Sequence, residues 1–130
     1  MRTINITFSI FIALIIFPLN DSYGAGRWNT AATLMDQCNA TLKLQDVDNP
    51  THDEHVKSVG CLSYLEGIKQ VLYEEYLLME QRNICFPEVG ISNGQAARIV
   101  VNYLEEFPDK LPEHKLQITL EAFSYAFPCE

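Results

Sequence analysis

The sequence lacks most of the patterns that mark an enzyme. It has no Gly-x-Ser-x-Gly nucleophile elbow and no glycine-rich phosphate loop. Its four cysteines include no pair at the two-residue spacing of a zinc ribbon or a redox motif. A cysteine that is used in a disulfide cannot serve as a thiolate nucleophile. We therefore predict a protein that is not an enzyme and that holds no cofactor and no metal ion.

Basic residues are also scarce. Nine lysines and arginines stand against 17 aspartates and glutamates, so the formal net charge is −8 at pH 7. A surface of this sign repels DNA, RNA and anionic lipid, and nucleic acid is therefore not an expected partner. The same charge weakly favours a basic protein partner.

Only three histidines are present, and two of them lie in one short acidic cluster. His52, Asp53, Glu54 and His55 could in principle hold a metal, because side chains one helical turn apart share a face. No third or fourth ligand follows at motif spacing. A solvated helix start, with acids placed favourably for the helix dipole, is the preferred interpretation.

Long apolar runs are missing except at the start of the chain. Residues 4–19 form one apolar stretch after Arg2, and Ser22 and Gly24 put small residues at the −3 and −1 positions of a cleavage site. The stretch is short for a membrane span. We expect a cleaved signal peptide over residues 1–24 and a periplasmic domain over 25–130, with no membrane attachment after cleavage.

Helical periodicity runs through four segments of the expected domain, at about 29–44, 51–82, 92–107 and 112–127. The second has the longest stripe, with Cys61, Leu65, Ile68, Leu72, Tyr76 and Met79 at steps of three and four. The third has the clearest start, because Ser92 and Gln95 form a capping box. No segment alternates with period two. The sequence predicts an all-α, compact four-helix domain.

The four cysteines all lie in this domain. An even count in a short exported chain indicates disulfides, and three pairings are possible in principle. Cys38 and Cys61 lie on the apolar stripes of the first two helices, while Cys85 follows the second helix and Cys129 follows the fourth. We expect Cys38–Cys61 and Cys85–Cys129, because these pairs join the nearest expected neighbours.

Several motifs together resemble a known family. They are CLSYLEG at 61–67, CFPEVGISNGQ at 85–95, YLEEFP at 103–108 and AFPC at 126–129. In this order they are similar to the Rap/Tai immunity proteins, the periplasmic partners of type VI secretion amidase effectors. The resemblance covers about residues 38–129.

The resemblance implies a binding function. Members of the family block a papain-like peptidoglycan amidase, as homodimers that place a loop or a helix over its Cys–His cleft. In this chain the 107–112 loop, which has Pro108 and Pro112 at its ends, and the outward face of the third helix could do so. The expected partner-binding residues are Asp109, Lys110 and Leu111 of the loop, with Asn102 and Glu106 nearby.

Two other functions stay open at this point. An acid-stress periplasmic chaperone of the HdeA kind is also small, helical and disulfide-bonded, and carboxylates neutralised near about pH 2–3 would let it expand. Two disulfides count against it, because they limit unfolding. A eukaryotic secreted binding protein is the third hypothesis, and the sequon Asn39-Ala40-Thr41 is its only specific sign.

Overall fold

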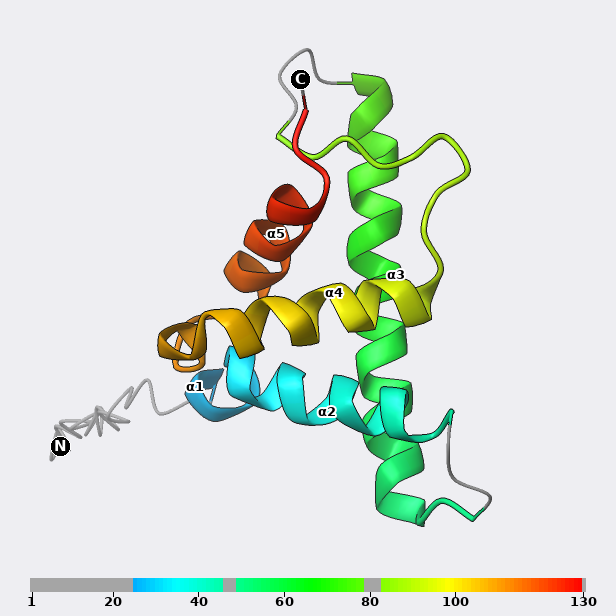
Figure 1. The fold of residues 1–130 in the computed structure, drawn as a ribbon, viewed down its shortest axis with the longest axis vertical. Helices are drawn as coiled ribbons and strands as arrows, with labels where there is room; N and C mark the ends of the chain where they lie inside the picture. The colour runs from blue at the N-terminus through cyan, green and yellow to red at the C-terminus, as the bar shows by residue number, and fades with distance from the viewer. Residues whose placement is uncertain (1–24, 46–48, 79–82, 130) are drawn as a thin grey trace, which may run out of the picture.

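A computed structural model describes residues 25–45, 49–78 and 83–129 of the chain, and these ranges fold into a bundle of helices (Figure 1). The expected signal peptide, residues 1–24, lies outside them, as do Met79 and Arg82. In chain order the elements are α1 (Ala25–Trp28), α2 (Ala31–Lys43), α3 (His52–Leu78), α4 (Asn93–Glu106), the 3-10 helix η1 (Pro108–Lys110) and α5 (Lys115–Ala126).

The predicted fold class is confirmed. The four longer helices coincide with the four periodic segments, and the described ranges contain no strand, only an isolated bridge between Thr30 and His114. None of the described helices is long and apolar enough to span a bilayer.

Local capping sets where the helices begin. Thr30 caps α2 by accepting the Thr33 N–H at 3.3 Å, and the predicted capping box at α4 is present in both directions. The last helix starts at Lys115 rather than near Pro112, because the imidazole of His114 accepts the Leu116 N–H and caps it there.

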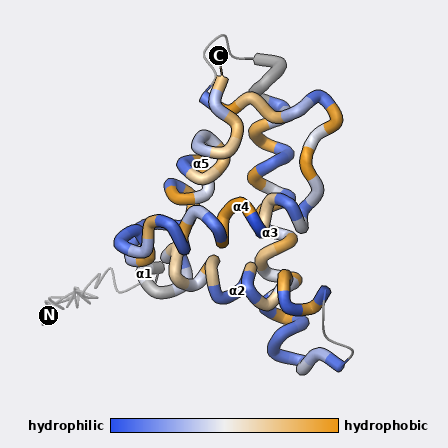
Figure 2. The backbone as a smooth tube through the Cα atoms, viewed as in Figure 1, coloured by the Kyte–Doolittle hydropathy of each residue, from blue (hydrophilic) through white to orange (hydrophobic). Residues whose placement is uncertain are grey.

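The longest helix, α3, forms one side of the bundle, and α2 and α4 pack against it. α2 and α4 lie side by side across α3, and α5 packs on α4 and α2 (Figure 1). Apolar and polar residues are mixed along each helix, so that each can turn one face to the core (Figure 2). The fully buried residues with the largest side chains are Phe123, Leu34, Leu65, Leu104, Ile118 and Val100.

Helical spacing in the sequence predicts that Leu116, Leu120, Phe123 and Phe127 form the buried face of the last helix, and this prediction is partly wrong. Phe123 is fully buried as expected, but Leu116 is 41% exposed. Ile118, Thr119 and Ala122 are buried in its place. Because α5 starts only at Lys115, Leu116 lies in its first turn, at the edge of the core rather than inside it.

Both predicted disulfides are present. The Cys38–Cys61 bridge, with Cα atoms 5.1 Å apart, joins α2 to α3 inside the core. The Cys85–Cys129 bridge, with Cα atoms 5.0 Å apart, joins the segment after α3 to the tail after α5.

A Cβ at Gly60 would lie 3.1 Å from the Gln37 side chain, so this glycine permits close approach of α2. No atom lies within 4 Å of the corresponding point at Gly67.

We predict that removing the core disulfide costs more stability than removing the outer one. The outer loop is longer, which favours the outer bridge by about 0.6 kcal/mol in chain entropy. Cys38 and Cys61 are fully buried, however, and each lost sulfur leaves a void worth about 1 kcal/mol. Urea unfolding of the double alanine variants at each bridge measures the difference. A smaller loss for the Cys38/Cys61 pair would contradict this account.

Candidate partner-binding surface

The predicted 107–112 loop is held tightly by the rest of the domain. The Lys110 ammonium lies 2.7 Å from the Glu121 carboxylate and 3.9 Å from that of Glu113. Its hydrogen bond holds the pKa of Glu121 below the ordinary value of 4.5, and the pKa of Lys110 is raised in turn. Leu111 packs partly buried against the core. Lys110 and Leu111 therefore have structural contacts of their own.

The backbone just after this loop completes the start of α2. The first N–H groups of a helix have no partner within it. Here the Ala31 N–H donates to the Glu113 carbonyl at 2.8 Å, and the Ala32 N–H donates to the Leu111 carbonyl at 2.9 Å. The Lys115 N–H donates to the Asn29 carbonyl at 2.7 Å. The link between α4 and α5 is thus fixed to the N-terminus of α2.

The other three predicted residues are exposed. Asp109 points to solvent on η1, and Asn102 and Glu106 lie four residues apart on α4. Glu106 accepts a hydrogen bond from the Tyr125 hydroxyl at 3.0 Å, which raises the pKa of Tyr125. The loop and the helix therefore both have exposed residues, and Asp109 alone of the three loop residues is fully at the surface, with no hydrogen bond or ion pair of its side chain to the described residues.

The outward side of α4 is polar along its whole length. Its exposed residues, here called the α4 face, are Gln95, Arg98, Asn102, Glu105 and Glu106. They recur at helical spacing opposite the buried Ala96, Val100 and Leu104. Among the described residues, Glu105, Glu106 and Asp109 form no ion pair with a basic side chain. The C-terminal half of this face is accordingly acidic.

A cavity of about 380 Å³ opens beside the N-terminal half of the α4 face. It lies between α4, the turn that precedes this helix and the tail that follows α5. Its lining is mainly apolar, and α4 contributes the three polar residues Gln95, Arg98 and Asn102. The other lining residues are Pro87, Val89, Gly90, Ile91, Ile99 and Phe127. The predicted residue Asn102 therefore stands between the cavity and the acidic end of the face.

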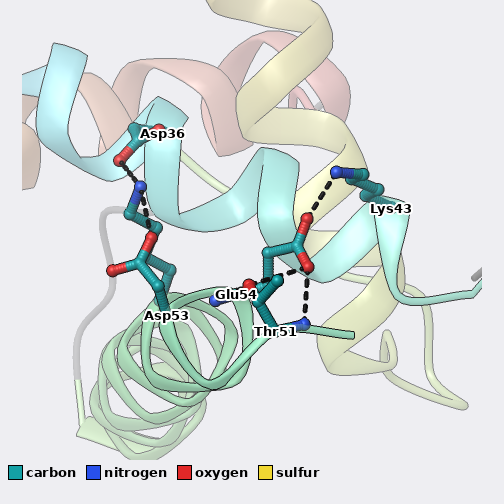
Figure 3. A network of polar contacts seen from close by, with 6 residues as sticks. Asp36, Lys43, Thr51, Asp53 and Glu54 are labelled. Carbon is teal, nitrogen blue, oxygen red and sulfur yellow. Dashed lines mark hydrogen bonds and ion pairs between the residues drawn. The ribbon is translucent and has the colours of Figure 1, made fainter. Parts of the chain in front are cut away.

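The His52–His55 cluster forms the first turn of α3, where Figure 3 shows Thr51, Asp53 and Glu54. Glu54 accepts the Thr51 N–H at 2.8 Å, and Thr51 accepts the Glu54 N–H at 3.3 Å. These two bonds form a second capping box, which the Thr-x-x-Glu spacing could have revealed from sequence. Lys43 pairs with Glu54. The part of the chain that the structure describes contains no group of three metal-ligating side chains.

A neighbouring ion pair completes this end of the domain. The Lys57 ammonium lies 3.0 Å from Asp53 and 3.1 Å from Asp36 (Figure 3). These contacts raise the pKa of Lys57, mainly through the hydrogen bond to Asp53. Together with Lys43 and Glu54, they connect α2 to the first turns of α3.

A comparison with protein families relates most of the chain to a known family. The family model described as Rap1a immunity proteins matches residues 30–129, which include α2 to α5 and all four cysteines. No curated protein and no solved structure is significantly similar to the chain.

We predict that Glu54→Gln lowers stability at neutral pH but not in acid. The bonds from Lys43 and Thr51 lower the pKa of Glu54 from 4.5 to about 2. Its ionised form therefore stabilises the fold above about pH 4.5, and this contribution is lost as the pH falls through about 2. Glutamine keeps the capping geometry, as Gln95 shows at α4, but removes the charge.

Urea unfolding of both proteins at about pH 7 and about pH 2.5 measures this difference. The gap between wild type and variant should shrink markedly at the lower pH. An equal gap at both values would show that the charge of Glu54 is not the cause.

Proposed function

This chain belongs to the family of Rap1a immunity proteins, and from that premise we propose that it protects the cell by binding a type VI secretion toxin. The toxin is a papain-like peptidoglycan amidase, and the immunity protein acts by covering its cleft, without chemistry of its own. The observation that carries the proposal is the family match, which extends over all four long helices.

The cross-links support a site of action outside the cytoplasm. Both disulfides join elements that lie far apart in sequence, and such bonds form and persist in oxidising compartments such as the periplasm. Peptidoglycan is also found there. We propose the periplasm as the compartment, with residues 1–24 as the signal that leads to it.

The α4 face and Asp109 are the proposed toxin-binding surface. Asn102, Glu106 and Asp109 are exposed on helical elements, whose backbone loses little conformational entropy when a partner binds. The carboxylates of Glu105, Glu106 and Asp109, which form no ion pair within the described residues, complement a basic rim around a cleft. We also expected Lys110 and Leu111 at this surface. Lys110 pairs with Glu121 and Leu111 packs against the core, and these contacts hold the loop that carries Asp109 in place.

A homodimer is part of the proposal, because the family resemblance implies one. It is checked by sedimentation of the domain alone. The family match gives no support to an acid-stress chaperone.

Co-expression with the neighbouring toxin tests the function directly. The mature domain is produced in the periplasm together with a Cys/His amidase encoded beside its gene. We expect the cells to survive and the two proteins to form a complex. Unchanged lysis and no complex at micromolar concentration would rule out the proposal for that pair.

A charge reversal tests the surface. We predict that the double variant Glu106→Lys with Asp109→Lys weakens toxin binding at least about tenfold, mainly by slowing association. Glu74→Lys, at an exposed position near the described end of α3, is the matched control and should bind normally. Calorimetry and stopped-flow kinetics measure both effects. Equal affinities for the two proteins would place the interface elsewhere.

A further inference from the structure

The segment before α4 contains a turn that is held unusually firmly. The Gly90 N–H donates to the Pro87 carbonyl at 2.8 Å, and Gly90 has a φ of +71°. Glu88 and Val89 form the tip of this turn. A Cβ at position 90 would lie 3.0 Å from the Tyr73 hydroxyl. Glycine is therefore required here both by the backbone angle and by the closeness of α3.

Two side chains of α3 fix the residue that follows the turn. The Ile91 N–H donates to the Tyr73 hydroxyl at 3.1 Å, and the Lys69 ammonium donates to the Ile91 carbonyl at 3.0 Å. Lys69 is only 6% exposed and also pairs with Glu66 at 3.1 Å. Burying a lysine costs free energy unless it is fully paired. The Glu66 carboxylate and the Ile91 carbonyl offset this cost, so that Lys69 and Tyr73 together hold both backbone polar groups of Ile91.

The other end of the turn is anchored as well. Phe86 packs its ring against Tyr73, Phe123 and Phe127, with centroids 5.0, 5.5 and 5.4 Å apart. The Cys85 N–H donates to the Phe127 carbonyl at 2.9 Å, and the Cys85–Cys129 disulfide lies beside this bond. The turn is therefore fixed on both sides.

This rigid turn presents an apolar side chain to solvent. Val89 is 95% exposed, the highest value among the large hydrophobic residues of the described chain. A loop that only connects two helices would need neither the buried Lys69 beneath it nor the exposed Val89 at its tip. An apolar residue held in one conformation loses little entropy when it enters a pocket on a partner, which is the behaviour of a binding anchor.

The cavity beside Val89 has a cation at its edge. Arg98 donates to the Gln45 side-chain oxygen at 3.3 Å, which orients the guanidinium. Within the described residues it has no carboxylate partner. Four lysines of this acidic chain, by contrast, each lie within 4 Å of a carboxylate: Lys43, Lys57, Lys69 and Lys110. Arg98 is also exposed, so that a carboxylate that comes from outside can reach it.

We propose that the Val89 turn and the cavity beside it are the site at which this protein distinguishes its own toxin from others. The occupant is a toxin segment that carries an apolar side chain next to a carboxylate. The apolar group fills the space lined by Ile91, Ile99 and Phe127, and the carboxylate pairs with Arg98. This inference rests on the proposed function and adds to it the chemistry that selects the partner.

Arg98 makes the choice selective through desolvation. A bound toxin removes water from the guanidinium, and a toxin without the carboxylate leaves it unpaired, which is costly. A matching carboxylate can accept two parallel N–H bonds from the guanidinium. The carboxylate opposite Arg98 thus decides whether a toxin binds well. The apolar contact adds affinity for toxins with and without this carboxylate.

Affinity measurements with the toxin test both halves of the site. We expect Val89→Ser and Arg98→Gln each to weaken binding at least about tenfold, with unchanged melting temperatures because both side chains are exposed. Val59→Ser is the matched control, since Val59 is 62% exposed on α3, and should bind as the wild type does. Normal affinity in both site variants, with a wild type that binds, would overturn this inference and leave the proposed function intact.

Chemical cross-linking identifies the carboxylate. Arg98→Lys places an amine at this position, and a carbodiimide then joins it to an adjacent toxin Asp or Glu, which mass spectrometry of the cross-linked peptide locates. No toxin carboxylate linked to position 98 would overturn the pairing. If the variants change the sedimentation of the domain alone instead of its toxin affinity, the occupant is a second copy and the proposal is wrong. A wild type that binds no toxin would remove both proposals together.

Discussion

The position of α2 on α3, fixed by the Cys38–Cys61 bridge, determines where everything else in the domain lies. Once α2 is in place, its first N–H groups need carbonyl partners, and Leu111 and Glu113 supply them. That requirement fixes the start of α5. The far end of α5 in turn carries Phe127 and Cys129, which hold the segment before α4. A continuous series of contacts therefore leads from the buried cross-link to the segment before α4.

Two parts of this surface differ in physical character. The C-terminal half of the α4 face, with Asp109, carries unpaired negative charge, which acts over a distance and is screened by salt. The Val89 turn and its cavity act only at contact, through shape and a single cation. A charged region that speeds encounter beside a rigid apolar region that slows separation is a common division in tight protein complexes. Asn102 lies at the boundary between the two.

The helices and the disulfide pairing were predictable because they depend on local spacing, as at Cys61, Leu65 and Ser92. The roles of Lys110 and Leu111 were not. Two prolines indicate a loop, but its partners on α2 and α5 are set by the tertiary fold. Val89 was present in a recognised motif, yet its exposure depends on the distant Lys69 and Tyr73. Of the features that the sequence analysis did not identify, only the Thr51–Glu54 capping box could have been recognised from its spacing in the sequence.

The last cysteine follows every residue that builds the core. Among the residues whose burial the structure describes, all fully buried side chains lie between Ala31 and Phe123, so a nascent chain can complete this interior before Cys129 is joined to Cys85. Until that oxidation takes place, no covalent bond ties the tail to the segment bearing Val89. Folding and maturation of the recognition surface are therefore separate events. A polypeptide that is cut short by a few residues, or that lacks only the Cys85–Cys129 bond, could therefore be folded while its selective surface is still unfinished.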